Sequence, residues 1–347
     1  MVRLRWSVCV PVLVALVLVS GVVTGNAQTS GQAPGASSAA AGRMIKPNQL
    51  IHVVASLEKS VGFYRDAIGF ELVSGPEPLT GSALLQQAVA ASPKAKARAA
   101  TFRIPGSEMQ FMLIEFSGIE GKAFSQQLYD PGITRFSIQV RDIDAAFARV
   151  KDRVVVNSTG GAPVFTQKPR NNTRAVMMHD PDGFVFEFVQ ADPLPETSVP
   201  KSSNVYNARS SLAIEDTAKS LAFYRDVLGY EARPQNTVND AVLALEGTPT
   251  AVAKTTSTSP PGSTNVWFFW EFSNIARTKH EPRVQDPGAS ALSLLVENLP
   301  ALLVRVKAAG TKVETVGGDV VALGPARRGV LVRSPDGLLV ELVEQMR

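Results

Sequence analysis

The stretch SVGFYRDAIGF at residues 60–70 returns as SLAFYRDVLGY at residues 220–230. Around the first copy, Leu57, Val61, Tyr64 and Ile68 recur at the spacing of one helical face. Gly69 is typical of the residue that follows a helix. A repeat this long indicates a domain rather than a solenoid unit, so the chain is predicted to hold two copies of one domain.

Strand patterns follow each predicted helix in the same order. Residues 110–116 alternate as a strand and are matched by 267–272, and the turn DPDG at 180–183 is matched by SPDG at 334–337. Each half therefore predicts two β-α-β-β-β units. We expect domains at residues 47–192 and 206–347, joined by a linker over 193–205 that is rich in Pro, Ser and Thr.

Composition bounds the class of protein. The 347 residues suffice for about two domains, and 45% hydrophobic with 19% charged residues is ordinary for globular cores. The net charge of +4 is not gathered into any run of Lys or Arg, so no nucleic-acid partner is expected.

The N-terminus predicts export. Arg3 and Arg5 precede an apolar run, and small residues end it at Ala27, which is typical of a signal peptide over residues 1–27. An uncleaved anchor is the alternative; after cleavage we expect no membrane association and a periplasmic or extracellular location. The single cysteine, Cys9, would leave with the peptide, and residues 28–46 are predicted to be a flexible linker.

These motifs together resemble the vicinal oxygen chelate superfamily, which includes glyoxalase I, bleomycin-resistance proteins and extradiol dioxygenases. The resemblance implies an α+β fold of tandem paired βαβββ modules, whose curved, cup-like mixed sheets carry helices outside. It also implies a divalent metal held in the cup by side chains of the first, fourth, fifth and last strands, acting as a Lewis acid. Carrying those positions over gives Gln49, Glu115, Arg135 and Glu187 in the first half, and Arg209, Glu271, Ala291 and Glu341 in the second.

Arginine at two of these positions changes the expected chemistry. A guanidinium has no lone pair to donate, but it can hydrogen-bond two carboxylates. We therefore expect Arg135 to stand for the cation between Glu115 and Glu187, and Arg209 between Glu271 and Glu341. With crossed pairing of the modules, two carboxylates would lack a cation, so cups within each sequence half are predicted.

Strand alternation predicts which side chains share the cup face. Ser137 and Gln139 alternate with apolar neighbours and share a face with Arg135. The other predicted lining residues share faces with the glutamates of their strands: Phe111, Leu113, Trp267 and Phe269. A cup filled by core side chains is the alternative. Residues 76–99 are long for a connection and are expected to lie at the mouth of the first cup, with 248–264 as their counterpart.

The expected function is binding of a small organic molecule in an apolar cup with a degenerate metal site. The alternative is a divalent-metal-dependent glyoxalase (a lyase) or an extradiol dioxygenase-like enzyme, with Gln49, Glu115 and Glu187 holding a metal in the first domain. No other cofactor is expected. The sequence leaves open the ligand, catalysis and the oligomeric state. His52, whose parity faces the helices, is interpreted as structural.

Overall fold

The computed structural model describes residues 42–124, 126–260 and 266–346. The predicted signal peptide and residues 28–41 of the predicted linker lie outside this range. Residues 43–46 of the predicted linker belong instead to the first strand, β1 (Arg43–Val53). Among the described residues, no helix is long and apolar enough to cross a membrane.

The described chain forms four βαβββ modules, defined here as module 1 (43–117), module 2 (134–190), module 3 (205–273) and module 4 (290–345). The strands of modules 1 and 2 are β1, β2 (Glu71–Pro78), β3 (Lys96–Arg103), β4 (Gln110–Ser117), β5 (Thr134–Val140), β6 (Val155–Val156), β7 (Val164–Phe165), β8 (Arg174–His179) and β9 (Val185–Gln190). The strands of modules 3 and 4 are β10 (Val205–Ile214), β11 (Glu231–Ala232), β12 (Asn236–Thr237), β13 (Val252–Ser259), β14 (Trp267–Ser273), β15 (Ser290–Glu297), β16 (Lys312–Val313), β17 (Val321–Gly324), β18 (Arg327–Arg333) and β19 (Leu339–Gln345).

Each module carries one helix between its first two strands. In modules 1 and 3 this helix begins as α and continues as π, and the π turns are the FYRD motifs. The helices are α2 (Leu57–Gly62) with η1 (Phe63–Ile68), α4 (Ile143–Val150) with η2 (Lys151–Arg153), α5 (Thr217–Leu221) with η3 (Ala222–Val227), and α7 (Leu299–Ala308). Gly69 ends the first at φ 98°, a left-handed conformation that favours glycine, as predicted. Shorter helices are α3 (Ala83–Ala91), α6 (Asp240–Leu245) and η4 (Val316–Gly318).

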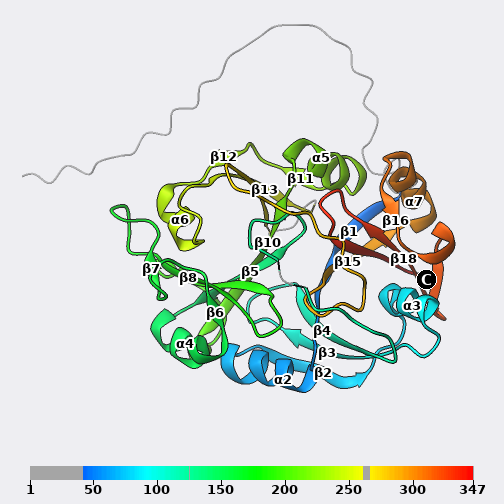
Figure 1. The fold of residues 1–347 in the computed structure, drawn as a ribbon, viewed down its shortest axis with the longest axis horizontal. Helices are drawn as coiled ribbons and strands as arrows, with labels where there is room; N and C mark the ends of the chain where they lie inside the picture. Colours follow the sequence, from blue (N-terminus) through cyan, green and yellow to red (C-terminus); the bar gives the residue numbers. More distant parts are fainter. Residues whose placement is uncertain (1–41, 125, 261–265, 347) are drawn as a thin grey trace, which may run out of the picture. The chain divides into compact units, whose positions relative to one another are not determined.

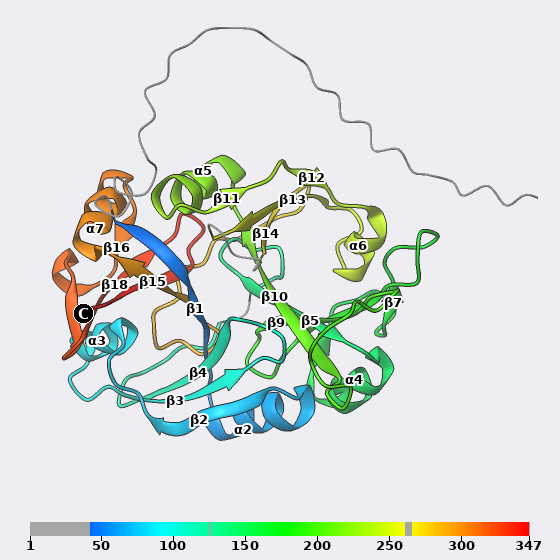
Figure 2. The same ribbon diagram turned by 180° about the vertical axis from the view of Figure 1, so that it is seen from behind.

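The modules pair across the sequence halves. Strand β1 pairs antiparallel with β15, so one sheet has the order β16-β18-β19-β15-β1-β4-β3-β2 and joins modules 1 and 4. Strand β10 pairs antiparallel with β5, so the other has the order β11-β13-β14-β10-β5-β9-β8-β6 and joins modules 2 and 3. Figures 1 and 2 show both pairings, with blue β1 beside β15 and green β5 beside β10. We call the two curved sheets cup A and cup B, respectively.

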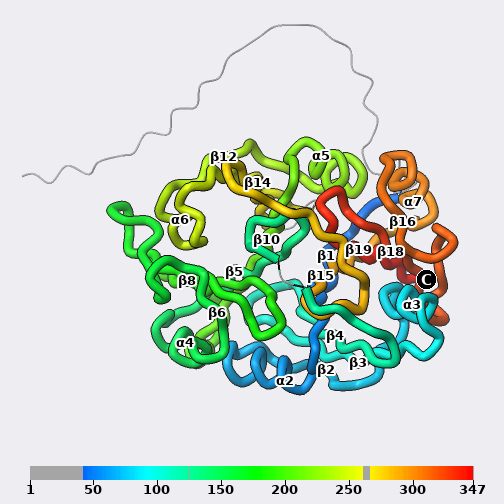
Figure 3. The backbone as a smooth tube through the Cα atoms, viewed as in Figure 1, coloured from blue at the N-terminus to red at the C-terminus, as the bar shows by residue number. Residues whose placement is uncertain are grey.

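The predicted pairing within each half is therefore wrong, although the α+β cup architecture is confirmed. Contacts within each half include packing between helices, since α4 contacts η1 and α7 contacts η3. Figure 3 traces the backbone, in which the chain passes from one sheet to the other between β4 and β5 and again between β14 and β15. One apolar core lies on the helix side of both sheets, and separate clusters lie inside each cup.

Candidate functional site

Cup B encloses an open cavity of about 380 Å³. Its walls combine apolar side chains, among them Met177, Phe268 and Trp270, with four charged ones. The charged residues are Arg135, Glu187, Arg209 and Glu246. A concave site with an apolar wall and few convergent polar groups is the usual form of a small-molecule site.

The floor of this cavity holds a buried ion pair. Nη1 of Arg135 donates to Oε1 of Glu246 at 2.7 Å, and the side chains are only 3% and 1% exposed. The guanidinium carbon also lies 4.5 Å from the ring centroid of Trp270. The prediction that Arg135 hydrogen-bonds Glu115 or Glu187 is wrong: its partner is Glu246, which directly follows α6 and was not among the predicted site residues.

Glu187 faces the same cavity and titrates near neutrality. Burial raises the pKa of its carboxyl group from 4.5 to about 7; a hydrogen bond from Ser137 and the charge of Arg135 oppose this, and Glu246 adds to it. Burial likewise raises the pKa of Glu246, while Arg135 lowers it. The carboxyl group of Glu187, with its pKa of about 7, is suited to exchange a proton with a ligand at neutral pH.

The sheet register shows which residues stand at neighbouring strand positions in cup B. Arg209 lies opposite Ser137, and Ser137 lies opposite Glu187. Ser137, two residues beyond Arg135, thus holds the fifth-strand position beside Glu187. A guanidinium, a hydroxyl and one carboxylate do not fit a divalent ion, because only the carboxylate is a strong ligand and the cation beside it repels the ion. Arg209 itself is exposed at the rim and does not lie between Glu271 and Glu341, contrary to the prediction.

Cup A has the corresponding row but is largely filled by α3. Gln49 lies opposite Gln110 and Ser293, and Ser293 lies opposite Glu341. Helix α3 packs its Ala83, Leu84 and Ala88 into the cluster inside this cup. Oε1 of Glu341 accepts from the backbone nitrogen of Ala83 at 2.6 Å and from the Ser82 hydroxyl at 3.0 Å.

Glu341 is the carboxylate on which a metal in cup A would depend, and it is already bound to the N-terminus of α3. A helix N-terminus stabilises an anion, so α3 takes the part of the metal. A cavity of about 210 Å³ remains beside Gln49 and Glu341. Residues 76–99 were expected at the mouth of a cup, but α3 lies inside it. The counterpart of α3 is α6, so the matching of 76–99 with 248–264 is wrong; residues 252–259 are strand β13.

Two predicted glutamates lie on the opposite face of their sheets. Oε2 of Glu115 accepts from the backbone nitrogen of Leu57 at 2.6 Å, and Arg98 donates to Oε1 at 3.1 Å. Oε2 of Glu271 accepts from the backbone nitrogen of Thr217 at 3.1 Å. Both carboxylates therefore hold the first turns of helices outside the cups.

The parity prediction is right about which residues share a face and wrong about where that face points. Phe111, Leu113, Trp267 and Phe269 lie with their glutamates on the helix side, in the common core. Phe268 and Trp270, of the other parity, line cup B together with Ser137 and Gln139. The candidate metal set Gln49, Glu115 and Glu187 is thereby dispersed over cup A, the helix side and cup B, and cannot hold one ion.

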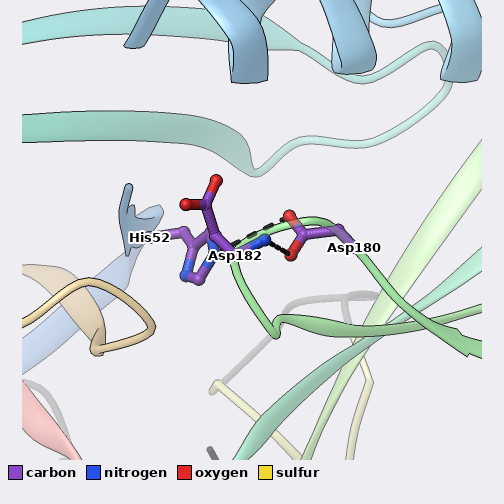
Figure 4. Close-up of side chains that lie close together, drawn as sticks. All are labelled: His52, Asp180 and Asp182. Carbon is purple, nitrogen blue, oxygen red and sulfur yellow. Dashed lines mark hydrogen bonds and ion pairs between the residues drawn. The ribbon is translucent and has the colours of Figure 1, made fainter. Parts of the chain in front are cut away.

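A different group of potential ligands lies on the helix side. His52, Asp180 and Asp182 place one ligand atom each within 4.8 Å of one another (Figure 4). Nε2 of His52 lies 3.7 Å from Oδ2 of Asp180. Neither ring nitrogen of this fully buried histidine has a hydrogen-bond partner among the residues that the structure describes.

The two carboxylates of this group are already engaged as acceptors. Tyr64 donates its hydroxyl to Oδ2 of Asp180 at 2.7 Å. Oδ1 of Asp182 accepts from the backbone nitrogen of Ala55, and Oδ2 from the Ser60 hydroxyl. The group thus connects module 1 to the β8–β9 turn of module 2. In the second half Leu212 and Ser334 replace His52 and Asp180, while Asp336 again accepts from Ser220.

Comparisons with known proteins agree with this architecture. The family model described as "Glyoxalase/Bleomycin resistance protein/Dioxygenase superfamily" matches residues 46–188 and again 208–342. No curated protein matches the sequence significantly.

Solved structures share the fold at low identity. Glyoxalase I from Zea mays aligns with TM-score 0.54 and 16% identity, covering 87% of this chain and 92% of that one. A single-residue mutant of the same maize enzyme aligns with TM-score 0.55 and 16% identity, over 88% and 94%. A putative dioxygenase from Bacillus subtilis aligns with TM-score 0.50 and 12% identity, over 87% and 86%. Likeness at this identity shows the fold and leaves activity to the residues of the site.

Proposed function

Because the chain belongs to the Glyoxalase/Bleomycin resistance protein/Dioxygenase superfamily, we propose that it keeps the family's cup as a binding site for a small organic molecule and does without a metal at the centre. The observation that carries this proposal is the contrast between the cups. Cup B has a cavity of about 380 Å³ over a buried Arg135–Glu246 pair, whereas α3 fills much of cup A.

The metal-independent part of the proposal follows from the donor sets. In cup B the row of Arg209, Ser137 and Glu187 offers one strong ligand next to a cation, and in cup A the one carboxylate of the row holds a helix N-terminus. Arg135 lies in cup B, but it pairs with Glu246 rather than with the predicted glutamates.

A paired substitution tests the binding site. Gln139→Trp directs a large ring into the cavity of cup B, and Leu295→Trp adds the same bulk at the corresponding position of cup A. A fragment library screened by saturation-transfer NMR should give binders to the wild type and to Leu295→Trp that are lost with Gln139→Trp. Equal loss in both variants, or no loss in either, would contradict a ligand site in cup B.

Metal content tests the other half of the proposal. After dialysis without chelator, elemental analysis should find no stoichiometric divalent ion, and fragment binding should be unchanged by added chelator. One retained equivalent that disappears in Glu187→Gln would overturn the proposal in favour of a metalloenzyme.

We further propose that the protein is exported, from the residues at its N-terminus alone. N-terminal sequencing of the protein purified from its native cells should begin at Gln28, and a chain beginning at Met1 would refute cleavage.

A further inference from the structure

The charges around the cavity of cup B restrict the kind of molecule that it can hold. Of its four charged side chains, Arg135 and Glu246 neutralise each other, and the raised pKa of Glu187 leaves this carboxyl group largely protonated below neutral pH. Arg209, exposed at the rim, forms no ion pair with any residue that the structure describes. The surplus charge of the cavity is therefore positive.

Arg135 keeps one edge of its guanidinium unused. Glu246 takes only Nη1, while Nε and Nη2, both buried, have no hydrogen-bond partner among the described residues. Nε and Nη2 form a fork of two parallel N–H groups, the geometry that matches the two oxygens of a carboxylate. Buried donors in folded proteins are almost always paired, so this edge is available to an acceptor that the described residues do not supply.

Apolar side chains of the cavity lie close to the guanidinium of Arg135. Trp270 stacks under the guanidinium at 4.5 Å and, with Phe268 and Met177, lines the cavity. A flat apolar body fits against such side chains by dispersion and by excluding water. A cationic ligand fits poorly, because Arg135 already covers a face of Trp270 and both guanidiniums would repel it.

The geometry points to an organic monocarboxylate with a flat apolar body as the ligand of cup B, its carboxylate on Nε and Nη2 of Arg135 and its body against Trp270. This inference rests on the proposed function and narrows it. Nε and Nη2 of Arg135 are buried in this structure, so this binding mode requires neighbouring side chains to move aside. Arg209 attracts the anion from the rim and contributes through charge alone.

Three probes of one shape test the inference: 2-naphthoate, its neutral amide 2-naphthamide, and the cation 2-naphthylmethylammonium. Calorimetry at pH 6 should show the carboxylate binding about ten- to a hundredfold more tightly than the amide, as expected for charge-assisted hydrogen bonds, and the ammonium not binding. Arg135→Lys keeps a charge for Glu246 but loses the fork, so it should remove most of the preference for the carboxylate over the amide.

The variant Arg209→Gln provides a second measurement if Arg135→Lys does not fold. It should weaken binding of the carboxylate several-fold, more so at low salt, and weaken binding of the amide less. Equal affinity for carboxylate and amide, with both lost in Gln139→Trp, would overturn the inference and leave the proposed function standing. Tight binding of the ammonium would overturn the inference in favour of a cationic ligand. No binding of any probe would also overturn it, and fragment screening would then decide the proposed function separately.

Discussion

Replacing Arg135 by alanine should be among the most destabilising single changes in cup B. The residue is 2% exposed, and its partner Glu246 would be left as an unpaired carboxylate with a side chain only 1% exposed. Breaking a buried pair by removing one partner typically costs about 3–5 kcal/mol, because the remaining charge has lost its compensation. Loss of the stacking on Trp270 adds to this cost.

The pH dependence gives this prediction its sharpest form. Burial already raises the pKa of Glu246, and removal of Arg135 raises it further. At low pH the carboxyl group of Glu246 takes up a proton, and the loss in free energy of unfolding becomes smaller. At high pH the group must either ionise in the interior or stay protonated although protons are scarce, and both cost free energy. Urea unfolding should therefore show a loss near 3–5 kcal/mol at pH 8 and a smaller loss at pH 5.

Two control variants distinguish loss of the Arg135–Glu246 ion pair from simple loss of packing. Arg135→Ala combined with Glu246→Ala should recover part of the lost stability at pH 8, because no charge remains unpaired. Arg209→Ala, at the exposed rim, should change stability by less than about 0.5 kcal/mol. A loss below about 1 kcal/mol for Arg135→Ala at pH 8, or a loss independent of pH, would refute the ion pair.

Three further predictions follow from other contacts. The pKa of Glu187 is about 7 in the folded protein against 4.5 for a free glutamate, so folding favours the protonated form and stability falls as the pH rises between these values. Glu187→Gln should therefore be up to about 3 kcal/mol more stable than the wild type at pH 8. A variant less stable than the wild type at that pH would contradict this. Leu84→Ala should cost about 2–5 kcal/mol in thermal or urea unfolding, because Leu84 is fully buried inside cup A, and a cost under 1 kcal/mol would mean that α3 is not docked there. His52→Leu introduces the residue found at the equivalent position 212 and should raise stability by about 1 kcal/mol, because it removes two ring nitrogens without a hydrogen-bond partner among the described residues. A clear loss of stability at every pH tested would show that His52 has a partner.

The module architecture could be predicted because its signals are local. The repeated FYRD helices, the glycine at 69 and the PDG turns are each fixed by short-range geometry, and two copies in one order exclude chance. The pairing of modules has no such signal. Strands β10 and β15 open equivalent modules, and which of them pairs with β1 or β5 depends on contacts between residues far apart along the chain.

The module pairing predicted from charge is wrong because a buried carboxylate does not require a guanidinium. Glu341 is satisfied by the backbone N–H of Ala83 and the hydroxyl of Ser82. Glu115 never enters a cup. Alternation could not reveal this, because the two faces of β4 are both largely apolar: one packs on the helices and the other on α3. Glu246 could have been suspected only by matching the segment around α6 to α3.

Crystals soaked with a fragment library test the central claim most directly, since they show both cups at once. The account predicts fragments in cup B against Trp270 and above the Arg135–Glu246 pair, and α3 seated in cup A with its N-terminus on Glu341. Fragments gathered between Gln49 and Glu341 in cup A, with cup B closed or holding a metal ion on Glu187, would contradict it.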